Sequence, residues 1–137
     1  MRVRIGKRWV PAQTRVNMLT ASRFNDQVVY AAFNNQRNGD FKPYLFKSAD
    51  RGTTWTSISS NLPDRGTVYC IKQDFKTPNL LFVGTEFGAY FTTDEGQHWT
   101  KLSGLPTIAV YDLEIQEREC DLVAATFGRG FYVLDNY

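Results

Sequence analysis

The feature that most constrains this 137-residue chain is a short motif that occurs twice. Ser48 to Trp55 reads S-x-D-x-G-x-x-W, and Thr92 to Trp99 reads T-x-D-x-G-x-x-W. Every matched position lies 44 residues further along in the second copy. A period in the forties is typical of architectures in which each repeat forms one small antiparallel sheet. The motif therefore predicts a chain that is built from repeated sheets.

Runs of strand-forming residues arrange themselves into units around the motif. Residues 16–60 and 67–103 are each predicted to hold four strands, and residues 109–137 three. Residues 2–10 alternate charged and apolar side chains and are predicted to form one strand, the last of a preceding unit. Strands at this spacing with turn signals between them are typical of β-propeller blades. A jelly roll or a sandwich would explain the alternation, but not three aligned copies.

The predicted fold is all-β: a partial β-propeller with two complete four-stranded antiparallel blades and incomplete strands at both ends, in one domain spanning residues 1–137. The composition agrees, because 42% of the residues are apolar and 15% are aromatic. A net charge of +2 is too small to indicate nucleic-acid binding. The sequence contains no stretch that could span a membrane. One histidine and two dispersed cysteines predict no metal site, and we expect no cofactor.

Each residue of the repeated motif has a structural role in the turn between the third and fourth strands. The aspartate accepts backbone hydrogen bonds, the glycine takes a positive φ, the hydroxyl joins the same network and the tryptophan packs over the turn. These structural residues are Ser48, Asp50, Gly52 and Trp55 in the first copy, and Thr92, Asp94, Gly96 and Trp99 in the second.

The motif resembles the Asp-box, or BNR repeat, of sialidases, xyloglucan-type glycosidases and the sortilin propeller. The run LFVGTEFGAYFTTDEGQHW is similar to a group of bacterial BNR proteins that are labelled sortilin-like or glycosyl-hydrolase-like. The resemblance implies the closing part of a propeller in a larger secreted or periplasmic protein. A closed propeller has about four to eight blades. The expected partners are therefore the remaining blades of a larger propeller, or a second copy of this chain.

In a propeller of this kind, the loops between second and third strands lie opposite the Asp-box turns and form the expected ligand face. On that face Glu86 and Asp112 are the catalytic candidates, because two carboxylates can flank a glycosidic bond. The alternative is that Glu86 pairs with Arg129 on the surface and that Asp112 caps a turn. The ligand-binding candidates are Arg37, Asp40, Lys42, Tyr69, Tyr111 and Arg129.

Three functions fit these observations. We favour a non-catalytic module that recognises a protein or a glycan. The second is a portion of a sialidase-like or xyloglucanase-like glycoside hydrolase. The third is an assembly subunit whose open blade edges pair with another chain. Enzymatic activity stays open, and a carbohydrate or protein ligand is expected in place of nucleic acid.

Overall fold

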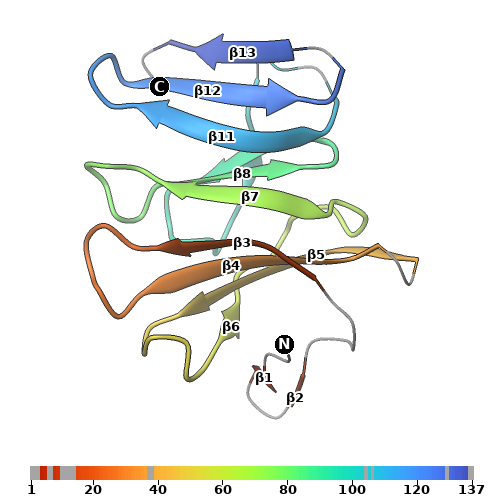
Figure 1. The fold of residues 1–137 in the computed structure, drawn as a ribbon, viewed down its shortest axis with the longest axis vertical. Coiled ribbons are helices and arrows are strands. Elements are labelled where there is room, and N and C mark those ends of the chain that lie inside the picture. The colour runs from red at the N-terminus through yellow and green to blue at the C-terminus, as the bar shows by residue number, and fades with distance from the viewer. Residues whose placement is uncertain are drawn as a thin grey trace.

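The computed structural model describes residues 4–5, 8–9, 15–36, 39–103, 105, 107–128 and 130–135, with side chains from residue 17 onward. The regular elements of this part are all β-strands, as the sequence predicts. They form one small hairpin and three antiparallel sheets that follow one another along the long axis of the molecule (Figure 1).

The three sheets, which we call blades 1, 2 and 3, each keep their strands in sequence order. Blade 1 contains β3 (Arg15–Ala21), β4 (Val29–Asn35), β5 (Asp40–Ser48) and β6 (Thr56–Ser57). Blade 2 contains β7 (Val68–Gln73), β8 (Leu81–Thr85), β9 (Gly88–Thr92) and β10 (Thr100–Lys101). Within the described residues, blade 3 contains β11 (Val110–Gln116), β12 (Asp121–Thr126) and β13 (Gly130–Leu134). Four, four and three strands confirm the predicted fold class.

Residues 2–10 differ from the single strand that the sequence predicts. Their described residues form two short strands, β1 (Arg4–Ile5) and β2 (Arg8–Trp9), which pair with each other. Ile5 pairs with Arg8, so two residues separate the strands, which is a common hairpin length. The alternation of charged and apolar residues did not distinguish one strand from a short hairpin, because both have a side-chain period of two. In Figure 1 the hairpin lies on the side of blade 1 away from blade 2.

The second strands of blades 1 and 2 form the centre of the fold. Every residue of β8 is buried, and the middle of β4 is buried as well. Each of these strands has a hydrogen-bonded neighbour on both edges. Both faces are covered too, so these segments are continuous apolar runs without alternation.

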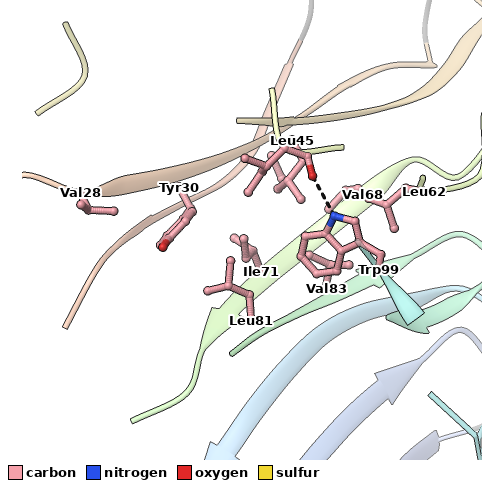
Figure 2. Packing of buried hydrophobic residues seen from close by; sticks show 11 residues of the cluster. Val28, Tyr30, Leu45, Leu62, Val68, Ile71, Leu81, Val83 and Trp99 are labelled. Atoms are coloured by element: carbon pink, nitrogen blue, oxygen red, sulfur yellow. Dashed lines mark hydrogen bonds between the residues drawn. The ribbon is translucent and has the colours of Figure 1, made fainter. Parts of the chain in front are cut away.

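Apolar side chains fill the space between successive blades. Figure 2 shows Tyr30 and Leu45 of blade 1 together with Ile71, Leu81 and Val83 of blade 2 in one buried cluster. A second cluster joins blades 2 and 3 and includes Phe82, Ala89, Leu113 and Leu122. The blades are therefore held together face to face by hydrophobic burial.

Candidate functional site

The Asp-box turn of blade 1 is closed by a compact set of hydrogen bonds. Ser48 Oγ accepts from the Gly52 N–H (2.8 Å) and donates to Asp50 Oδ1 (2.8 Å). The Thr54 N–H donates to Asp50 Oδ1 (2.8 Å), and the Thr54 hydroxyl donates to Asp50 Oδ2 (2.5 Å). The hydroxyl of Thr54 is the main reason why the pKa of Asp50 is lowered to about 2. Both carboxylate oxygens of Asp50 are thus engaged inside the turn.

The turn of blade 2 repeats this arrangement. Thr92 Oγ1 accepts from the Gly96 N–H (3.1 Å) and donates to Asp94 Oδ1 (2.5 Å). The His98 N–H donates to the same carboxylate oxygen (3.0 Å). The hydrogen bond from Thr92 is the largest cause that lowers the pKa of Asp94 to about 2. Gly52 and Gly96 have φ values of 91° and 94°, which glycine adopts most readily.

The indole N–H groups of the two motif tryptophans have different hydrogen-bond partners. Trp55 Nε1 donates to the Gly52 carbonyl of its own turn (3.0 Å). Trp99 Nε1 donates instead to the Ile58 carbonyl of blade 1 (2.8 Å), the dashed line in Figure 2. Asn61 adds two further bonds, from the Trp99 N–H to its Oδ1 (2.6 Å) and from its Nδ2 to the Trp99 carbonyl (2.9 Å). The second motif therefore joins two blades.

The opposite end of the sheets carries three equivalent β-bulges. The pairing of the first strand of each blade shifts by one residue between Val16 and Met18, between Val68 and Cys70, and between Val110 and Asp112. The inserted residues are Asn17, Tyr69 and Tyr111. A bulge re-aims a side chain and is common next to functional sites. Both tyrosines were predicted from the sequence as ligand-binding residues, but Asn17 was not; the alignment of Val16, Val68 and Val110 would have found it.

Three aromatic side chains, which we call the aromatic row, lie in sequence across blades 2 and 3. The ring centroids of Tyr69 and Tyr111 are 4.6 Å apart with the planes at 56°, and those of Tyr111 and Phe127 are 5.8 Å apart at 82°. Tyr111 is 44% exposed and Phe127 68% exposed. The structure thus brings two predicted ligand-binding residues together. Phe127 lies in the β12–β13 turn, and its side chain was not singled out from the sequence.

Amide side chains of blade 1 continue this surface. Gln36 Nε2 donates to the Tyr69 hydroxyl (3.0 Å), and this hydrogen bond opposes the burial that raises the pKa of Tyr69. Asn34 Nδ2 donates to Asn17 Oδ1, and Asn17 Nδ2 donates to the Val68 carbonyl (2.8 Å). Asn17, Asn34 and Gln36 therefore form an amide set that meets the aromatic row at the boundary of blades 1 and 2.

The two carboxylates proposed for catalysis lie at the same end. Glu86 is half-buried in the β8–β9 turn, where its N–H donates to the Thr67 carbonyl (3.1 Å). After burial, the charge of Glu86 contributes to the raised pKa of Tyr69, so this carboxylate lies near the row. Asp112 is exposed beside Tyr111, and its Oδ1 accepts from the Leu113 N–H (2.9 Å). A catalytic role for either residue stays a prediction.

The remaining ligand-binding candidates belong to the β4–β5 hairpin and the β12–β13 turn. Asp40 accepts hydrogen bonds from the Tyr44 hydroxyl, Asn35 Nδ2 (3.1 Å) and the Lys42 N–H (3.1 Å). Burial acts to raise the pKa of Asp40, but these hydrogen bonds lower it overall. Asp40 thus closes the hairpin, while the Lys42 side chain is exposed. Arg37 and Arg129 lie outside the described residues.

A cleft of about 450 Å³ lies between blades 1 and 2 at the Asp-box end, away from the aromatic row. Lys47 of blade 1 and Glu95 of blade 2 form an ion pair at its wall. In the part of the chain that the structure describes, no group of three His, Cys, Asp or Glu is placed to hold a metal ion. The same part contains no helix that is long and apolar enough to cross a membrane.

Known proteins with similar sequence or structure are larger than this chain, which matches a part of each of them. No protein-family model matches the chain. A probable oligoxyloglucan-reducing end-specific xyloglucanase of Neosartorya fischeri is 32% identical over 83 residues, which cover 53% of this chain and 10% of that protein. The chain therefore spans about a tenth of this curated relative.

Two solved structures share the arrangement of strands. The GH74 enzyme of Niastella koreensis superposes with a TM-score of 0.69 and 17% identity, over 88% of this chain and 21% of the enzyme. YCF48 bound to a D1 peptide superposes with a TM-score of 0.61 and 19% identity, over 95% of this chain and 42% of YCF48. At these identities the likeness concerns the fold alone. The chain thus has the fold of part of a β-propeller.

Proposed function

We propose that this chain is a portion of a β-propeller that recognises a carbohydrate at its bulged end. The aromatic row of Tyr69, Tyr111 and Phe127 is the observation that carries the proposal. Aromatic faces stack on the apolar faces of sugar rings, and a few fixed polar groups beside them orient the ligand. The amide set supplies such groups next to the row. Similarity to a probable oligoxyloglucan-reducing end-specific xyloglucanase favours an oligoxyloglucan as the ligand.

The proposal predicts binding that depends on Tyr111. Calorimetric titration with xyloglucan oligosaccharides is expected to give saturable binding that becomes about tenfold weaker in Tyr111→Ala, because one stacking partner is lost. Phe24→Ala is the matched control, since Phe24 is an exposed aromatic residue in the β3–β4 turn at the other end. Equal affinities for Tyr111→Ala and the wild type would contradict the proposal. Binding of extended peptides in place of sugars would favour protein recognition.

A part of a glycoside hydrolase is the second candidate, because Glu86 and Asp112 lie at the same end as the row. Retaining and inverting hydrolases both act with two carboxyl groups on either side of the scissile bond. Release of new reducing ends from xyloglucan, lost in Glu86→Gln, would decide for hydrolysis. The proposed module then works within a secreted or periplasmic protein, where polysaccharide substrates occur.

The remaining blades of a larger propeller are the partners that we propose, because the outer face of blade 3 is apolar and exposed. A second copy of the chain is the alternative partner. Ala31, Phe33 and Phe46 on the outer face of blade 1 are already buried, so we place the partner on blade 3.

A further inference from the structure

The β4–β5 hairpin of blade 1 is attached to blade 2 by three separate contacts. Gln36 Nε2 reaches the Tyr69 hydroxyl (3.0 Å) across the blade boundary. Thr67 Oγ1 donates to the Phe41 carbonyl (3.2 Å), and the guanidinium of Arg65 lies 5.6 Å from the centre of the Phe41 ring. The described residues near the tip of the hairpin are therefore held against the neighbouring blade, unlike a freely solvated loop.

Of these contacts, the one made by Gln36 acts on the aromatic row. Tyr69 is the inserted residue of the β7 bulge, so its side chain is not held by the regular alternation of the strand. Its ring lies 4.6 Å from that of Tyr111, and its hydroxyl accepts the Gln36 hydrogen bond. One end of the ring is thus fixed by the backbone and the other by a residue of the neighbouring blade.

We propose that Gln36 is a positioning residue that holds the Tyr69 ring against Tyr111 and so sets the affinity of the row for its ligand. The inference rests on the carbohydrate-binding function proposed above. It adds that the binding surface crosses the boundary of blades 1 and 2, where Gln36 meets Tyr69. The ligand class that fits such a surface is an oligosaccharide longer than one sugar ring.

The test compares variants of Gln36 and Tyr69 in the full chain. Gln36→Leu removes the hydrogen bond and keeps an apolar side chain that reaches the δ position, whereas Tyr69→Phe keeps the ring and removes the hydroxyl. Each is expected to bind xyloglucan oligosaccharides about five- to tenfold more weakly, the size of one net hydrogen bond. The double variant is expected to be no weaker than either single one, because both remove the same contact. Gln36→Glu, which can accept a hydrogen bond from the Tyr69 hydroxyl, is expected to restore most of the affinity.

A second measurement does not depend on any ligand. The ring resonances of Tyr111, observed by NMR of labelled tyrosine, report on the neighbouring Tyr69 ring. They are expected to shift in Gln36→Leu and to stay in place in Gln27→Leu, an exposed glutamine at the other end of blade 1. The melting temperature is expected to fall by only a few degrees in Gln36→Leu, the size of one net hydrogen bond, and to stay that of the wild type in Gln27→Leu.

The outcomes separate this inference from the proposed function. If Gln36→Leu alters neither the Tyr111 resonances nor the affinity, the positioning role is overturned and carbohydrate binding stands. If the wild type binds no oligosaccharide while the Tyr111 resonances still shift, the proposed function is overturned and the holding of the ring by Gln36 is supported. An additive loss of affinity in the double variant would also contradict a shared contact.

Discussion

At the scale of single residues, the ionisation of the two motif aspartates is coupled to the fold. Asp50 and Asp94 both have a pKa lowered to about 2 by hydrogen bonds within their turns. An unfolded aspartate has a pKa near 3.9. The unfolded chain therefore binds more protons between about pH 4 and pH 2. Stability from these turns is present above pH 4 and is lost as the pH falls through this window.

Asp94→Asn tests this coupling. The variant is expected to be less stable than the wild type at pH 7, because an amide accepts the turn hydrogen bonds less strongly than a carboxylate. The difference in free energy of unfolding should shrink between pH 4 and pH 2, when the wild-type carboxylate becomes protonated. Urea unfolding at a series of pH values measures it. Asp64→Asn, in the exposed turn before β7, is the control. A difference that stayed constant with pH would count against the hydrogen-bonded carboxylate.

At the scale of elements, the strands could be predicted from the sequence but the bulges and the cross-blade bonds could not. Periodic apolar runs and turn residues report the local backbone, so the strands of all three blades were found. Trp55 and Trp99 occupy the same place in one motif, yet their indole N–H groups bond to different blades. The acceptor of the indole N–H depends on whether the Ile58 carbonyl lies next to the ring. Such a long-range contact cannot be read from the motif. A bulge likewise depends on pairing that a single strand does not reveal.

For the candidate site too, contacts between residues far apart in the sequence could not be predicted. Tyr69 and Tyr111 were selected from the sequence because their strands begin at the loop face. Gln36 was not, because its contact with Tyr69 joins residues 33 positions apart in two blades. The side chain of Phe127 was missed because Arg129 was the residue selected from its turn. Residue types indicate which chemistry is available, but long-range packing decides which side chains meet.

Gly84 provides a prediction at this scale, because β8 passes close to blade 3. A Cβ added there would lie 2.5 Å from the Val110 carbonyl oxygen and 2.7 Å from Cys70 Sγ. Gly84→Ala is therefore expected to lower the free energy of unfolding by about 2–3 kcal/mol, since two blades would have to separate. Ala32, the equivalent residue of β4, already carries a Cβ. Ala32→Gly is the matched control and should cost only about 1 kcal/mol. An unchanged Gly84→Ala midpoint in urea would contradict this packing.

At the scale of the whole molecule, equivalent faces of the three blades differ in how far they are buried. Leu45, Ala89 and Phe131 occupy equivalent places in the third strands of their blades. Each pairs with a second-strand residue, and that residue also pairs with the first residue after the bulge. Leu45 and Ala89 are fully buried by the following blade, whereas Phe131 is 76% exposed and its neighbour Val133 is 56% exposed. The outer face of blade 3 carries apolar side chains like those that are buried between the other blades. In the described part of the chain, no blade covers it. Exposed apolar patches of this kind mark interaction surfaces.

The exposed face gives a prediction about solubility. The 137-residue chain is expected to bind a hydrophobic dye and to self-associate, and Phe131→Ser combined with Val133→Thr should reduce both. The double variant should leave the free energy of unfolding within about 0.5 kcal/mol, because both side chains are already exposed. Leu45→Ala, at the equivalent covered place, should instead cost about 3 kcal/mol. Dye fluorescence and sedimentation give the readout. If the double variant bound as much dye as the wild type, the dye-binding surface would not be the outer face of blade 3, and the prediction would be wrong.

The three aligned bulges also bear on how such a surface changes over evolutionary time. Each blade contributes one side chain, Asn17, Tyr69 or Tyr111, that lies outside the alternating pattern of its strand. Substitution of a bulge residue does not alter the other side chains of its strand, which alternate regularly and pack between the blades. Duplication of a blade therefore supplies a new variable position together with an unchanged scaffold. A propeller built in this way can acquire a different ligand through a few substitutions at fixed places, while its packing stays under separate selection.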